Sequence, residues 1–237
     1  RETSAIGCLQ VQNDWIQCTP WNNPKEKGMG LGWTFAQSGA AEYGLWVSTT
    51  GKRFVNELAN RKVRADAIMV EQTNGHRAVA ICTLPNLKAY EVARPGMLKK
   101  LVADGIVKEY KSLDEIAADY KIPAEELKKT VEGFNKAVET KNDPEFGRYI
   151  NAEQVPLTEG PWYAAEMSPK VHHCMGGLVT DMKCHVIDIV DSKPITGLYA
   201  AGEATSGVHG AVRLGSCAIL DCLVNGRIAG QSAAKGE

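Results

Sequence analysis

The most regular pattern in this chain is a set of apolar residues that recur at intervals of three or four positions near its middle. The positions are Leu127, Val131, Phe134 and Val138. This spacing places the side chains on one face of a helix, which we expect to pack into a core. Pro123 suits the start of that helix, because proline lacks a backbone N–H and none is needed in the first helical turn.

Shorter patterns predict further elements before that helix. Ser112 is followed three residues later by Glu115, a spacing typical of the capping box that begins a helix. The run Ala78–Thr83 (AVAICT) is short and apolar, which suits a buried strand. Residues 45–55 read as a hairpin, because two β-rich arms flank a turn at Gly51.

The last third of the chain has a different character, because glycine and small residues interrupt its apolar runs. Residues 197–203 (GLYAAGE) read as a short strand that ends in a carboxylate. A Gly-rich loop then leads to an apolar helix expected at 216–229. This order predicts a mixed domain inserted into an α/β nucleotide-binding domain, whose closing strands and helix end the chain.

Composition and charge narrow the classes of function. Hydrophobic residues make up 44% of the 237 positions, charged residues 23%, and the formal net charge is −1, an ordinary globular balance. Lys and Arg are scattered, which argues against nucleic-acid binding. No run approaches the roughly 20 apolar residues that span a bilayer. The chain lacks a visible secretory signal and begins with Arg1, so we expect a fragment of a longer protein.

The seven cysteines show no spacing typical of a metal or haem site. No C-x-x-C and no C-x-x-C-H occurs, so the sequence predicts neither a zinc site nor covalently attached haem. We expect most thiols to be buried as small apolar groups. A redox pair of Cys217 and Cys222 is the alternative.

Three Gly-rich blocks carry the candidate chemistry. In the first, His172 and His173 precede two glycines, so that a ligand can approach closely; two structural histidines are the alternative. The second ends in Glu203, whose carboxylate suits a hydrogen bond from a ribose or ribityl hydroxyl; a plain buried strand is the alternative. The third places Arg213 before the last helix, where its guanidinium fork suits a carboxylate; a surface arginine is the alternative.

Together, the motifs HHxMGG (172–177), GLYAAGE (197–203) and GVHGAxRLG (207–215) resemble the flavin-binding end of the fumarate reductase/flavocytochrome c group. That group includes urocanate reductase, acrylate-type reductases and 3-ketosteroid dehydrogenases. The segment 51–61 and the helix after Pro123 also fit, so the resemblance covers nearly the whole chain.

The resemblance implies a fold of the α/β and α+β classes, in which a mixed capping domain interrupts a Rossmann-like FAD-binding domain. We expect residues 1–13 to belong to the FAD-binding domain, 14–167 to the capping domain, and 168–237 to the C-terminal portion of the FAD-binding domain. The fingerprint G-x-G-x-x-G is absent and lies N-terminal of the insertion in relatives. An N-terminal FAD-binding half is therefore an expected partner, without which we expect the chain to be inactive.

The resemblance also implies a reaction and roles for single residues. A reduced flavin passes hydride to the β-carbon of an α,β-unsaturated carboxylate, and an arginine, here Arg61, protonates the α-carbon. His172 and Arg213 are implied to hold the substrate carboxylate and make the β-carbon more electrophilic. The implied FAD contacts are His173, Glu203, Ser216, Cys217, Ala218 and Ile219. A haem or FMN domain or protein is the implied electron donor, and the bacterial cytoplasm or periplasm the implied compartment.

The sequence departs from the fumarate pattern at four positions. Thr19 stands where fumarate reductases have a histidine. Counted back without gaps from Gly51, the relay glutamate and arginine fall on Gln37 and Ala40, and a substrate-holding threonine falls on Ala36. An arginine has a pKa of about 12 or higher and needs a relay that reprotonates it. The usual relay is therefore predicted to be broken.

These departures predict a reductase of unsaturated monocarboxylates, since a second carboxylate buried without partners is costly. Trp21, Trp33 and Phe35 suit an apolar or aromatic substituent, as in methacrylate or cinnamate, unless they belong to the core. Arg64, one turn beyond Arg61, is an alternative relay group, although we expect a solvated surface arginine. Three other functions remain open: fumarate reductase or succinate dehydrogenase proper, a non-catalytic capping fragment, and a 3-ketosteroid-type dehydrogenase.

Overall fold

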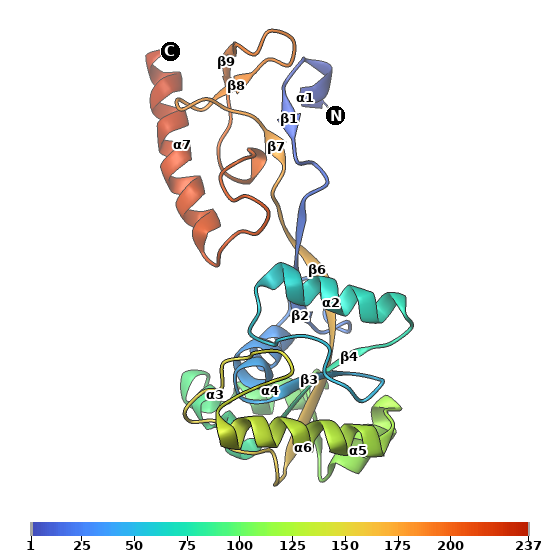
Figure 1. The fold of residues 1–237 in the computed structure, drawn as a ribbon. Coiled ribbons are helices and arrows are strands. Elements are labelled where there is room, and N and C mark those ends of the chain that lie inside the picture. Colours follow the sequence, from blue (N-terminus) through green and yellow to red (C-terminus); the bar gives the residue numbers. More distant parts are fainter. Residues whose placement is uncertain (1, 237) are drawn as a thin grey trace. The chain divides into compact units, whose positions relative to one another are not determined.

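A computed structural model describes residues 2–236, which divide into two compact units. One unit joins the chain up to Cys18 with the chain from Val171 onwards, and the other is Thr19–Lys170. Both contain helices and strands (Figure 1). The predicted mixture of α/β and α+β architecture is therefore confirmed, whereas the assignment of the units as flavin-binding and capping domains stays a prediction.

The central unit is built on a five-stranded sheet (Figure 1). Its strands are β2 (Ile16–Asn22), β3 (Leu45–Ser48), β4 (Ala78–Thr83), β5 (Lys108–Tyr110) and β6 (Trp162–Cys174). The order is β2-β6-β4-β3, with β5 also paired to β6. β4 runs antiparallel to both β3 and β6, and all six of its residues are buried, as the unbroken apolar run predicted.

Helices cover both faces of this sheet. They are the π-helix η1 (Thr34–Ala41), α2 (Arg61–Thr73), the 3₁₀ helix η2 (Leu84–Leu87), α3 (Lys88–Ala93), α4 (Met97–Ala103), α5 (Leu113–Tyr120) and α6 (Ala124–Thr140). Successive strand residues point to opposite faces. Ala80 accordingly packs in the core with η1, α2, α3 and α4, whereas Ile81 packs in the core with α5 and α6.

The strongest sequence patterns are confirmed on the second face. Helix α6 begins directly after Pro123, and all four of its periodic apolar residues are buried. The Ser112 hydroxyl accepts the Glu115 backbone N–H at 3.3 Å and so caps α5. The predicted hairpin at 45–55 is wrong in its second arm, which makes only a single bridge to β3, at Arg53.

Arg53 keeps its bridge to Val47, while its side chain enters a buried ion cluster. Its Nη2 lies 2.8 Å from a Glu57 carboxylate oxygen and 2.9 Å from Asp143, and Arg148 lies 3.4 Å from Glu57. Burial opposes the charged form of Arg53, but hydrogen bonds and charges from Glu57 and Asp143 raise its pKa. The cluster fixes the loop that leads into α2, and thereby the start of the helix that carries Arg61.

Replacing Glu57 with glutamine is expected to lower the free energy of unfolding by about 3–5 kcal/mol, because Arg53 and Arg148 stay buried without their shared carboxylate. Urea unfolding measures this loss. Asp66→Asn is the matched control, because the Lys62–Asp66 pair is half exposed and should change stability by about 0–1 kcal/mol. Equal effects of the two substitutions would contradict the structural role of the cluster.

The other unit contains two small antiparallel pairs and a long helix. Its elements are α1 (Glu2–Ala5), β1 (Gln10–Val11), β7 (Gly177–Leu178), β8 (His185–Ile187), β9 (Pro194–Tyr199), the 3₁₀ turn η3 (Gly202–Ala204) and α7 (Cys217–Lys235). β1 pairs with β7, and β8 with β9. Helix α7 extends six residues beyond the predicted end at 229. Within residues 2–236, every helix is too short or too polar to cross a bilayer.

Candidate active site

His172 and Arg213 lie in direct contact. His172 lies near the end of β6, and Arg213 in the loop before α7. Arg213 Nη2 is 2.5 Å from His172 Nε2, and Arg213 Nη1 donates to the Leu214 carbonyl at 2.7 Å. Arg213 is only 6% exposed, so the alternative of a surface arginine is wrong. The structure therefore brings together the two residues predicted to hold a carboxylate.

The charge of Arg213 has no counterion within its surroundings. Among residues 2–236, no carboxylate pairs with its guanidinium, and its buried Nε lacks a hydrogen-bond partner. A buried cation without a partner is strongly destabilising. A bound carboxylate would supply both the missing charge and the missing acceptor.

Gln17 is a supporting residue that sequence reasoning missed. It lies in β2, is 2% exposed, and donates from Nε2 to the Arg213 carbonyl at 3.1 Å. This bond ties the loop of Arg213 to the strand. The sequence did contain one signal for Gln17. Side chains alternate between the two faces of an extended strand, so Gln17 lies on the same face of β2 as Thr19.

His173 is held in place by Glu203. Its Nδ1 lies 3.3 Å from Glu203, whose other carboxylate oxygen accepts the Cys174 backbone N–H at 2.8 Å. Burial lowers the pKa of His173, and the charge of Glu203 only partly opposes this effect. The His209 ring meets it edge to face at 5.4 Å between centroids. His173 and Glu203, both predicted as flavin contacts, are thus joined with His209 in one cluster.

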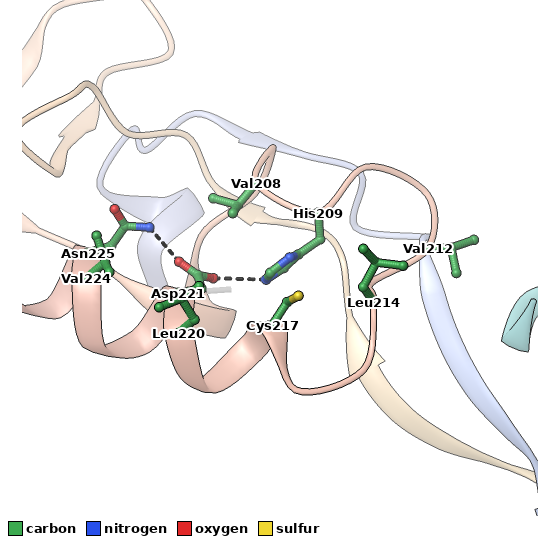
Figure 2. A pocket seen from close by; sticks show the side chains of 9 residues that line it. All are labelled: Val208, His209, Val212, Leu214, Cys217, Leu220, Asp221, Val224 and Asn225. Carbon is green, nitrogen blue, oxygen red and sulfur yellow. Dashed lines mark hydrogen bonds and ion pairs between the residues drawn. The ribbon is translucent and has the colours of Figure 1, made fainter.

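Beside this cluster, an apolar pocket of about 420 Å³ opens along the first turns of α7 (Figure 2). Its apolar lining consists of Val208, Val212, Leu214, Cys217, Leu220 and Val224. His209 and Asp221 add a polar contact, with 3.1 Å between Nε2 and the carboxylate (Figure 2). Sequence reasoning missed both residues, although Asp221 was the one charged position in the first two turns of an otherwise apolar helix.

The predicted helix-end residues lie where α7 begins. Ser216 is the N-cap, and Cys217, Ala218 and Ile219 form the first turn. Ser216 has a φ of 65°, a left-handed conformation that costs a serine about 1–3 kcal/mol and is often found at functional sites. In this first turn the Cys217 N–H donates to the Leu214 carbonyl at 3.4 Å and the Ile219 N–H to the Ser216 carbonyl at 3.2 Å, both outside the regular helical pattern.

These features fit the ring end of FAD. The apolar pocket suits the flavin ring, and the helix start suits a carbonyl edge. An added Cβ at Gly207, Gly210 or Gly215 would meet nothing within 4 Å, which leaves this loop open to a ligand. The chain has no Gly-rich fingerprint for a pyrophosphate, so its residues fit only part of the cofactor.

Arg61 belongs to the central unit and begins α2, capped by Asn60, whose side chain accepts the Val63 N–H at 3.0 Å. Its guanidinium carbon lies 5.4 Å from the centre of the Trp21 ring. Arg64 lies on the same ring at 4.7 Å. Arg64 is 6% exposed, so the expectation of a solvated surface arginine is wrong: packing against Trp21 removes it from water.

The other positions that depart from the fumarate pattern offer no free polar group. The buried Thr19 hydroxyl is hydrogen-bonded to the Asn22 side chain. Ala36 and Ala40 belong to η1 and are buried in the core. The Gln37 side chain accepts from Arg64 at 2.7 Å. This part of the chain therefore presents no second site for a carboxylate at the predicted positions.

The aromatic residues predicted to line a pocket lie in or against one hydrophobic core: Trp21 and Phe35 are buried members of it, and Trp33 packs against it. Phe35 is fully buried in the core, so its assignment to a pocket wall is wrong. Trp33 packs against Arg94, whose guanidinium carbon lies 5.4 Å from the ring. Trp21 packs against Arg61 and Arg64 and keeps a buried indole N–H without an acceptor.

This chain is similar to known flavoproteins. The family model for the FAD binding domain matches residues 5–219. The acrylate reductase flavoprotein subunit of Shewanella woodyi is 34% identical, over 96% of this chain and 45% of the relative. The probable fumarate reductase Ifc3 of Shewanella frigidimarina is 36% identical, over 97% of this chain and 37% of the relative.

A solved structure is also similar to this chain. The open conformation of a flavocytochrome c3 fumarate reductase superposes with a TM-score of 0.71 at 31% identity and covers 99% of this chain. This chain covers 39% of that structure. The chain thus spans less than half the length of each of these three proteins.

Proposed function

Because the chain belongs to the FAD-binding domain family, we propose that it contributes to a flavin-dependent reductase of the C=C bond in α,β-unsaturated carboxylates. The observation that carries the proposal is Arg213, a buried cation beside His172 with an unsatisfied Nε. The relatives named above are reductases of acrylate and of fumarate, which are both unsaturated acids. When bound and reduced by an electron donor, FAD would supply the hydride that reduces the double bond.

In this proposal, His172 and Arg213 bind one carboxylate of the substrate. Their donors stabilise the negative charge that spreads from the α-carbon into the carboxylate as the β-carbon is reduced. The Gln17 bond to the Arg213 carbonyl keeps the guanidinium in place. Arg61 then delivers a proton to the α-carbon, which completes the saturated acid.

The finer part of the proposal is a preference for monocarboxylates. Thr19 is hydrogen-bonded to Asn22, and Gln37 to Arg64, while Ala36 and Ala40 carry no polar group. A second substrate carboxylate would have to be buried without the partners that fumarate requires. An acid of the acrylate or cinnamate type avoids this cost.

Oxidation of a reduced dye by the complete FAD-loaded protein tests the carboxylate grip. We expect acrylate to be reduced with a kcat/KM at least about 100-fold above that of acrylamide, because a charge-assisted bond contributes about 1.5–3 kcal/mol and Arg213 and His172 offer two. A neutral enone that reacts faster than every unsaturated acid would instead support a dehydrogenase of neutral ketones. Failure of all unsaturated acids to react would refute the reductase.

A further inference from the structure

Arg64 is a buried cation that the proposed reaction does not yet use. Its Nη1 donates to the Gln37 side-chain oxygen at 2.7 Å and to the Glu57 carbonyl at 2.8 Å. Its Nε is buried and lacks a hydrogen-bond partner. In the part of the chain that the structure describes, no carboxylate pairs with it. Two neutral oxygens and the rings of Trp21 and Trp46 therefore surround this guanidinium.

The surroundings of Arg64 favour loss of a proton. Arg61, three residues earlier in α2, shares the Trp21 ring with it, at 5.4 Å and 4.7 Å. Burial, and then the charge of Arg61, lower the pKa of Arg64 to about 10, although Glu42 after η1 and Glu57 before α2 oppose this shift. Arg64 thus releases a proton more readily than an arginine in water, whose pKa is about 12 or higher.

A path towards solvent begins at the same residue. The Gln37 side chain that accepts from Arg64 donates in turn to Glu42 at 3.5 Å. Glu42 is only partly buried. The amide of Gln37 cannot ionise, so it orients Arg64 without taking its proton.

We propose that Arg64 is the positioning residue that returns a proton to Arg61 after each turnover, an inference that rests on the proposed function. Protonated Arg61 gives its proton to the substrate α-carbon and becomes neutral. Arg64 passes a proton to Arg61, and neutral Arg64 then takes one from water on the Glu42 side. No electrons move in these steps, and one proton from solvent enters the product per turnover.

The test uses the complete FAD-loaded protein, with acrylate as substrate and propionate as the non-reacting ligand. In Arg64→Gln we expect kcat to fall about 100-fold, within the range of a lost proton-transfer group. The Kd for propionate should stay within about threefold, because Arg64 acts through Arg61 and not on the ligand. Arg64→Lys should recover at least about tenfold in kcat, with an alkaline limb displaced from that of the wild type.

Arg77→Gln is the matched control, because Arg77 lies in the same unit and pairs with Glu166 at a half-exposed site. Its kcat should equal that of the wild type. An unchanged kcat in Arg64→Gln overturns the proposal. It is also overturned if kcat and the affinity for propionate fall by the same factor and Arg64→Lys restores neither. A wild-type protein that reduces no unsaturated acid overturns the proposed function itself, whereas an active wild type beside an unaffected Arg64→Gln overturns the relay alone.

Discussion

Replacing Arg213 with methionine is expected to lower kcat/KM for acrylate by about 10²- to 10³-fold, since losing one partner of a buried charge pair costs about 2–5 kcal/mol and 1.4 kcal/mol is a factor of ten. The loss should appear in KM and kcat together, because the guanidinium is proposed to bind the carboxylate in the substrate and more strongly in the transition state. Steady-state kinetics of the complete FAD-loaded protein measure both. Arg213→Lys should recover only part of the activity, because an ammonium lacks the planar fork.

The control for this substitution is Lys193→Met, which removes an exposed cation from the same unit. We expect its kinetics to match the wild type. An Arg213→Met protein that binds FAD and reduces acrylate at the wild-type rate would show that the buried guanidinium serves another purpose.

Replacing Arg61 with glutamine is expected to lower kcat by about 10²- to 10⁴-fold, the range found when a proton donor is removed. Affinity for propionate should change little, because Arg61 is proposed to act on the α-carbon and not on the carboxylate. Lys62→Gln is the neighbouring control, since Lys62 forms an exposed pair with Asp66. A kcat within about threefold of the wild type in Arg61→Gln would assign the proton to another group.

Local sequence patterns predicted α6, the N-terminal cap of α5 and the strand β4. The period of three and four residues in α6, the Ser112 cap and the apolar run of β4 depend on residues close together in the chain. The second arm of the hairpin was wrongly predicted for the opposite reason. Arg53 is drawn into contact with Asp143, 90 positions away, and no local pattern contains that information.

The site residues likewise divide into those that sequence motifs identified and those whose role depends on distant contacts. The motifs of the last third identified His172 and Arg213, which the structure brings into contact. Arg64 was misjudged because its burial depends on Trp21 and Gln37, which lie far from it in sequence. Gln17 was missed because its partner is a backbone carbonyl, which no residue type reveals.

The comparisons confirm the predicted resemblance, the flavoprotein oxidoreductase family and FAD as its cofactor. The roles of single residues, the N-terminal FAD-binding half and a haem or FMN electron donor stay predictions. The cellular compartment also stays a prediction. The coarse class, a family of reductases acting on unsaturated acids, is supported by relatives named for acrylate and for fumarate.

The proposed preference for one carboxylate rests on the region around η1. There a buried threonine uses its hydroxyl internally, two alanines fill the core, and a neutral glutamine holds Arg64. None of these four side chains offers a charged group to a second carboxylate. The proposed carboxylate site at Arg213 and the uncharged side chains around η1 together define the expected substrate.

The most direct test of this account is the ratio of kcat/KM for acrylate to that for fumarate, measured with the complete FAD-loaded protein and one reduced dye. We expect a ratio of about 10 or more, because one charged hydrogen-bonded group left without partners costs about 1.5–3 kcal/mol. A ratio below one, with fumarate the better substrate, would contradict the proposal that the chain binds a single carboxylate.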